Sequence, residues 1–134
     1  MNVTERILVL DDDHLVGQFV SEAARAIGLS CLATQNPMTL LDCVTPDTTL
    51  IFLDLVSPHA DGIELLRILS QIPCKANIVL MSGADARVLE ATEEWGKTLG
   101  LTIVGYLQKP VRLAQLEAIL EANRDDLERS STAS

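Results

Sequence analysis

Long apolar runs and clustered positive charge are both missing from this sequence of 134 residues. A membrane-spanning helix needs about 20 apolar residues, and the four-residue run before Asp11 is too short even for a signal peptide. Lys and Arg total 10 against 19 acidic residues, so the net charge is −9. Because nucleic-acid backbones demand clustered Lys and Arg, a direct nucleic-acid partner is not expected. The protein is expected in the cytoplasm, without a membrane segment.

Paired cysteines are also missing. Cys31, Cys43 and Cys74 are odd in number and show no CxxC spacing. Neither a disulfide framework nor a zinc site fits them, and free thiols in a reducing compartment are expected.

Five short apolar runs do recur along the chain. They are Ile7–Leu10, Cys31–Ala33, Leu50–Leu53, Ile78–Met81 and Ile103–Leu107. Most are continuously apolar rather than alternating, which is typical of strands buried on both faces of a parallel sheet.

Amphipathic segments separate these runs. Helices are predicted over about His14–Ile27, Pro37–Val44, a stretch containing Leu65–Leu69, Ala86–Leu99 and Leu113–Ala122. Fivefold alternation of strand and helix predicts one α/β domain, a three-layer doubly wound sandwich over residues 1–123. Residues 124–134 lose the apolar spacing and are predicted to be a frayed helix end followed by a tail or linker.

Polar residues follow four of the five runs. Asp11 and Asp12 come after the first run, Asp54 after the third, Ser82 after the fourth and Lys109 after the fifth. In an open parallel sheet the carboxyl ends of the strands form the ligand-binding edge. The sequence therefore predicts that three carboxylates, one hydroxyl and one ammonium converge there.

Crowded carboxylates repel one another unless a cation or protons intervene. A set of oxygen ligands without His or thiolate suits magnesium (Mg2+). The ion would neutralise an incoming phosphoryl group, Lys109 would pair with one of its oxygens, and Ser82 would donate a hydrogen bond to another. These groups are suited to phosphoryl transfer to an aspartate.

Four stretches at residues 7–13, 53–62, 78–83 and 105–110 resemble the sequence blocks of response-regulator receiver domains (CheY-like). The resemblance runs from about Arg6 to Ala122. It implies a flavodoxin-like fold with five parallel strands in the order 2-1-3-4-5 and five helices. It also implies a signalling switch rather than an enzyme that acts on an outside substrate.

The resemblance further implies a role for each residue of the cluster. Asp54 corresponds to the phosphoacceptor and a metal ligand, Asp12 to a direct metal ligand, and Asp11 to a ligand that acts through water. The backbone carbonyl of Val56 corresponds to the third protein ligand. Lys109 is the phosphoryl-pairing lysine.

Two residues are implied as the conformational switch, namely Ser82 as its hydroxyl and Tyr106 as its rotating aromatic side chain. The implied donor is a sensor histidine kinase or phosphotransfer protein. The implied readout is an output domain or partner that contacts helix 86–99, strand 103–107 and helix 113–122, and homodimers are among the expected assemblies. A looser similarity is to receivers attached to EAL-type cyclic-di-GMP phosphodiesterases, although a stand-alone receiver or a fragment of a longer chain fits equally well.

Two other functions stay open. Asp11-x-Asp13 after an apolar strand resembles the nucleophile and acid–base pair of haloacid-dehalogenase-type phosphatases, but that interpretation leaves Asp54 without a role. A receiver fold that is never phosphorylated and only binds partners is the second alternative, against which the complete acidic cluster argues.

Overall fold

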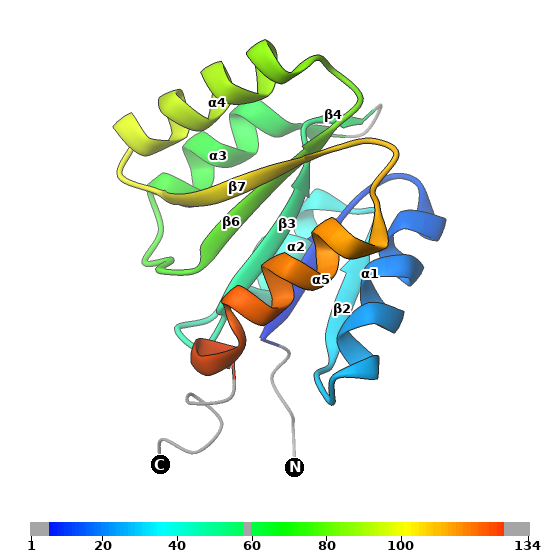
Figure 1. Ribbon diagram of the computed structural model, residues 1–134. Helices are drawn as coiled ribbons and strands as arrows, with labels where there is room; N and C mark the ends of the chain where they lie inside the picture. Colours follow the sequence, from blue (N-terminus) through cyan, green and yellow to red (C-terminus); the bar gives the residue numbers. More distant parts are fainter. Residues whose placement is uncertain (1–5, 58–59, 128–134) are drawn as a thin grey trace.

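A five-stranded parallel sheet lies between two layers of helices in the computed structural model, which describes residues 6–57 and 60–127 (Figure 1). The strands are β1 (Ile7–Leu10), β2 (Cys31–Thr34), β3 (Leu50–Asp54), β6 (Asn77–Ser82) and β7 (Thr102–Gln108). Their order in the sheet is β2-β1-β3-β6-β7, and every pair is parallel. The predicted doubly wound sandwich with strand order 2-1-3-4-5 is confirmed.

Each face of the sheet has its own helical layer and its own apolar core. The helices α1 (His14–Ala26) and α5 (Leu113–Ala122) cover one face, and α2 (Pro37–Cys43), α3 (Gly62–Ser70) and α4 (Ala86–Thr98) cover the other. Successive strand side chains point to opposite faces, so Leu8 packs in the core beneath α2–α4 while Val9 packs in the core beneath α1 and α5. This two-sided burial explains why the central strands β1, β3 and β6 are almost continuously apolar.

Polar caps begin four of these five helices. The side chains of Asp13, Asn36, Asp61 and Asp85 accept hydrogen bonds from backbone N–H groups in the first turns of α1, α2, α3 and α4. Such caps satisfy N–H groups that have no partner within the helix. They fix where each helix leaves the sheet.

Two elements were not predicted. A small antiparallel hairpin, β4 (Val56–Ser57) with β5 (Ala60–Asp61), precedes α3. A further helical turn covers residues 124–127, where the sequence predicted only a frayed helix end, and it adds a short sixth helix to the predicted five. Pro58 and His59 of the turn, and residues 128–134 of the predicted tail, lie outside the described residues. The domain boundary at residue 123 stays a prediction.

The described helices are short, with 13 residues in the longest of the five named above. None of them is long and apolar enough to cross a lipid bilayer. None of the three cysteines forms a disulfide with another described residue.

Candidate functional site

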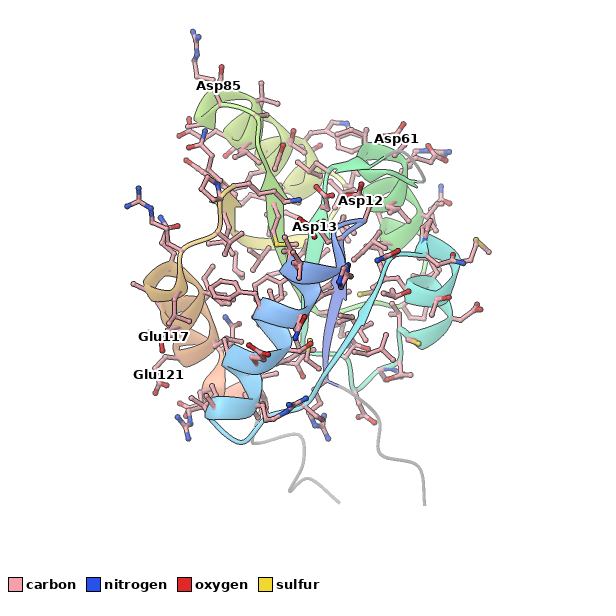
Figure 2. The ribbon with its side chains drawn as sticks, turned by 90° about the vertical axis from the view of Figure 1, so that its right-hand side faces the viewer. Asp12, Asp13, Asp61, Asp85, Glu117 and Glu121 are labelled. Carbon is pink, nitrogen blue, oxygen red and sulfur yellow. The ribbon has the colours of Figure 1, made fainter. Side chains whose placement is uncertain are left out.

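The polar residues that follow the strands meet at one edge of the sheet, toward the upper right of Figure 1. The register of the strands fixes this arrangement, because their carboxyl ends are aligned. Leu10 at the end of β1 pairs with Leu53 of β3, Asp54 at the end of β3 pairs with Met81 of β6, and Ser82 at the end of β6 pairs with Gln108 at the end of β7. Figure 2 shows Asp12, Asp13, Asp61 and Asp85 at this end, whereas Glu117 and Glu121 lie on α5 away from it.

Three carboxylates form a compact cluster at this edge. One oxygen from each of Asp11, Asp12 and Asp54 lies within 4.8 Å of the others. Asp11 and Asp54 are almost fully buried, with 2% and 1% of their surface exposed, and Asp12 is the more exposed of the three. The backbone N–H of Asp13 donates a 2.9 Å hydrogen bond to Asp11 Oδ1, which orients that carboxylate.

Lys109 supplies the positive charge of the cluster. Its Nζ lies 2.7 Å from Asp11 Oδ2 and 3.4 Å from Asp54 Oδ2. Burial lowers the pKa of Lys109, but the hydrogen bond and charge of Asp11 and the charge of Asp54 outweigh it, so the pKa is raised overall. The backbone N–H of Lys109 donates to the Ser82 carbonyl at 2.8 Å, which holds the two strand ends together.

Ser82 is buried, with 1% of its surface exposed. Its Oγ accepts a 3.0 Å hydrogen bond from the backbone N–H of Ala84. From the other side, Gln108 Nε2 donates to the Ala84 carbonyl at 2.9 Å. The loop between β6 and α4 is therefore held in place by the same hydroxyl that was predicted to act as the switch.

Tyr106 lies on β7, partly packed against the core beneath α4. Its hydroxyl donates a 3.2 Å hydrogen bond to Glu90 Oε1 of α4. That hydrogen bond, partial burial and the charges of Glu90 and Glu93 together raise the pKa of Tyr106. Sequence reasoning missed Glu90, because a pairing across 16 residues between a helix and a strand leaves no local pattern.

Val56, whose carbonyl oxygen was predicted as a metal ligand, begins β4 two residues after Asp54. Its backbone pairs with Asp61, the residue that caps α3. The role of this carbonyl stays a prediction.

The donor set fits a small hard cation. Three carboxylate oxygens lie close enough to share one ion, and no nitrogen or sulfur ligand belongs to the cluster found among the described residues. Such a set matches the oxygen coordination that Mg2+ prefers.

Asp13, which the phosphatase alternative requires as an acid–base residue, instead caps α1. Its side chain accepts a 3.0 Å hydrogen bond from the Leu15 N–H.

Comparisons with known proteins identify the fold and the family. The family model described as "Response regulator receiver domain" matches residues 7–121. A solved response regulator from Colwellia psychrerythraea is similar with a TM-score of 0.78 and 29% identity, over 90% of this chain and 96% of that one.

Two relatives show how far the similarity extends. The transcriptional regulatory protein DcuR of Escherichia coli (strain K12) is 29% identical over 121 residues, 85% of this chain and 48% of that protein. Sporulation initiation phosphotransferase F of Bacillus subtilis (strain 168) is 26% identical, over 70% of this chain and 77% of that protein. This chain thus spans about half the length of DcuR and most of the shorter relative. Since the family model covers most of the chain and the fold agrees with it, the chain belongs to the receiver domain family of two-component response regulators.

Proposed function

We propose that this receiver domain is switched by phosphorylation of Asp54 in the presence of Mg2+. The observation that carries the proposal is the position of the Asp54 carboxylate, which is buried beside Asp11 and Asp12 and lies 3.4 Å from the Lys109 ammonium. A carboxylate placed among cation ligands and an ammonium is suited to attack a phosphoryl group.

In the proposed reaction an oxygen of Asp54 attacks phosphorus, and the bond from phosphorus to the donor breaks. The donor is a phosphohistidine of a sensor histidine kinase or phosphotransfer protein, whose imidazole nitrogen leaves. Asp11, Asp12, Asp54 and the carbonyl of Val56 would hold the Mg2+, which neutralises charge on the phosphoryl oxygens when bound. Lys109 pairs with one phosphoryl oxygen, for which its ammonium must turn from Asp11.

The proposed switch begins at Ser82. A phosphoryl group brings nearly two negative charges and strong acceptors, so the Ser82 hydroxyl turns to donate to it and pulls on the loop that it now orders through Ala84. Movement of this loop frees Tyr106 from Glu90 and lets the ring turn inward beneath α4. The process is a population shift, because phosphorylation needs only to favour the inward state.

The proposed readout is the surface formed by α4, β7 and α5, which Tyr106 helps to form. An output domain or separate partner, or a second subunit, would recognise it. The half-length match to DcuR is consistent with an output domain in a longer protein. The looser sequence resemblance makes a cyclic-di-GMP phosphodiesterase of the EAL type one candidate for that domain. A cytoplasmic location agrees with a kinase donor of this kind.

Acetyl phosphate with Mg2+ tests the acceptor directly. We expect intact-mass measurement to show one added phosphoryl group, labile to base, and we expect Asp54→Asn to lose it. Asp85→Asn is the matched control, since Asp85 lies at the same end but caps α4 instead of joining the cluster (Figure 2). Wild-type phosphorylation in Asp54→Asn would refute the assignment, and steady turnover of a phosphate ester would favour a phosphatase.

A further inference from the structure

A groove of about 680 Å³ runs between α3 and α4. Ile63 of α3 and Val88, Ala91 and Trp95 of α4 line it. It lies apart from the side of α4 where Glu90 meets Tyr106 of β7, because Glu90 is not among its lining residues. The phosphorylation site and the Tyr106 switch therefore leave this groove without a role.

The groove exposes apolar surface that the fold does not cover. Ile63 is 42% and Val88 51% exposed. Trp95, the single tryptophan of the chain, is half-buried, since it lines the groove while its other side packs on the core beneath α4. Positions 88, 91 and 95 are spaced by three and four residues, so they form one apolar row along the helix.

Two opposite charges flank this row. Arg87 and Glu94 are exposed and seven residues apart, which places them on one side of α4 about 10.5 Å apart at 1.5 Å per residue. Neither forms an ion pair with another described residue. Arg87 lies four residues before Ala91 and Glu94 three residues after it, so Ala91 is close to their midpoint.

We propose that this groove is a self-association surface, in which α4 of one copy packs antiparallel on α4 of a second copy about a twofold axis near Ala91. In that arrangement Arg87 of each copy faces Glu94 of the other, and Val88 of each copy comes beside Trp95 of the other. The small Ala91 side chain at the centre lets the two helices approach closely.

Charge complementarity selects a second copy as the occupant. The two charges of the patch satisfy one another when the same patch is presented in reverse direction, which is the symmetry of a twofold interface. The exposed apolar surface belongs to few side chains, so the interface is small and the association is weak, with dissociation constants of about 10 µM to 1 mM.

Sedimentation over a range of concentrations tests this with a charge swap. We expect the mass of wild-type protein to rise from 14.5 kDa toward the dimer. Arg87→Glu and Glu94→Arg should each weaken association about tenfold, since either change turns both ion pairs into repulsions. The double variant Arg87→Glu/Glu94→Arg should restore it, and Trp95 fluorescence should follow concentration in parallel.

The most informative variant is Glu94→Arg. This variant makes the acidic chain less negative. If only nonspecific charge repulsion between copies mattered, association would therefore strengthen, whereas the proposed ion pairs predict that it weakens. Arg25→Glu on α1, exposed on the other face of the sheet, is the matched control and should leave association unchanged. A wild-type monomer at every concentration, a Glu94→Arg variant that associates as strongly as wild type, or a double variant of native circular dichroism that stays monomeric would each overturn the proposal.

Discussion

At the scale of single residues, the acidic cluster concentrates more negative charge than its one ammonium can balance. Asp11, Asp12 and Asp54 share a space of a few ångströms, and Lys109 contacts two of them. Carboxylates this close repel each other, and the repulsion weakens the folded state relative to the unfolded chain, where they separate. A cation that binds only the folded cluster must therefore stabilise it.

Mg2+ is accordingly expected to raise the free energy of unfolding measured with urea. At a free concentration of about one hundred times the dissociation constant the gain is about 2.7 kcal/mol. Replacing Asp12 by Asn removes the most exposed of the three carboxylates and should abolish most of this gain, while relieving repulsion in the metal-free protein.

The adjacent Asp13 provides the control for this experiment. Asp13→Asn keeps a good cap on α1 and lies outside the cluster, so its response to Mg2+ should match the wild type. An undiminished Mg2+ response in Asp12→Asn would show that the ion binds elsewhere.

The hydroxyl of Tyr106 offers a second prediction at this scale. Its pKa is raised first by the hydrogen bond to Glu90, then by partial burial and by nearby charge. Glu90→Ala removes both the acceptor and the largest nearby charge, so the phenol should ionise at a lower pH. Because the chain has one tyrosine, the ultraviolet absorbance of tyrosinate reports this group alone.

Glu93→Ala is the natural comparison, since Glu93 acts on Tyr106 through charge only. We expect a smaller fall of the Tyr106 pKa in that variant. Equal curves for wild type and Glu90→Ala would mean that Tyr106 does not occupy the outward position in solution.

At the scale of elements, what the sequence could predict was set by periodicity and caps. The strand Ile7–Leu10 has the predicted bounds, and the last strand extends the predicted run by one residue at each end, to Thr102 and Gln108. Strands buried on both faces are easy to recognise because most of their positions must be apolar. The β4–β5 hairpin could not be predicted in this way, since two-residue strands are too short to carry a period.

The site was predictable for a related reason. Strand ends are visible in the sequence, and a parallel sheet brings them to one edge, so Asp11, Asp54, Ser82 and Lys109 could be grouped from their positions in the chain. Contacts that depend on how a helix packs over the sheet could not be predicted from positions in the chain. The Glu90–Tyr106 hydrogen bond is of this kind, and the hydrogen bond from Gln108 to the carbonyl of Ala84, in the loop before α4, likewise joins residues far apart in the sequence.

The packing of α1 on β2 yields a prediction about Gly17. A Cβ at this position would lie 2.9 Å from the Cβ of Ala33, closer than real side chains approach. Gly17→Ala gains about 1 kcal/mol of helix propensity but forces the two elements apart, at an overpacking cost of about 1–3 kcal/mol. We expect a net loss of about 1 kcal/mol in urea unfolding.

A double-mutant cycle isolates this contact. Ala33→Gly removes the opposing methyl group, so in that background Gly17→Ala should become neutral or stabilising. The same loss in both backgrounds would mean that the close approach of α1 to β2 is not what selects glycine.

At the scale of the whole molecule, the site and the end of the described chain lie at opposite ends of the strands. The site is at the carboxyl ends, and the end of the described chain is at the amino ends. Asn77 at the start of β6 donates a 2.6 Å hydrogen bond to Asn123, which follows α5, whereas Ser82 at the end of β6 belongs to the site. A signal from Asp54 that reaches a following segment by way of α5 must therefore cross the length of the sheet.

The helical turn 124–127 lies at that far end, and it changes where the compact domain ends. Leu127 is only 1% exposed and packs in the core beneath α1 and α5. The sequence contains a pattern for this contact, because Leu120 and Leu127 are seven residues apart and continue one helical stripe. The pattern was missed because Asn123 and the charged residues after it interrupt the apolar spacing.

Leu127→Ala tests whether this turn is part of the folded domain. If it is docked, the change leaves a cavity in the core and lowers the free energy of unfolding by about 2 kcal/mol, the low end for Leu→Ala because a chain end can relax. Asp125→Ala is the control, since Asp125 is exposed on the same turn and should change stability by no more than about 0.5 kcal/mol. Urea unfolding followed by circular dichroism measures both. If Leu127→Ala were as stable as the wild type, the turn would be frayed in solution and the domain would end at residue 123, as the sequence predicts. A clear loss of unfolding free energy would extend the domain to Leu127 and anchor any following segment at the end of the sheet opposite Asp54.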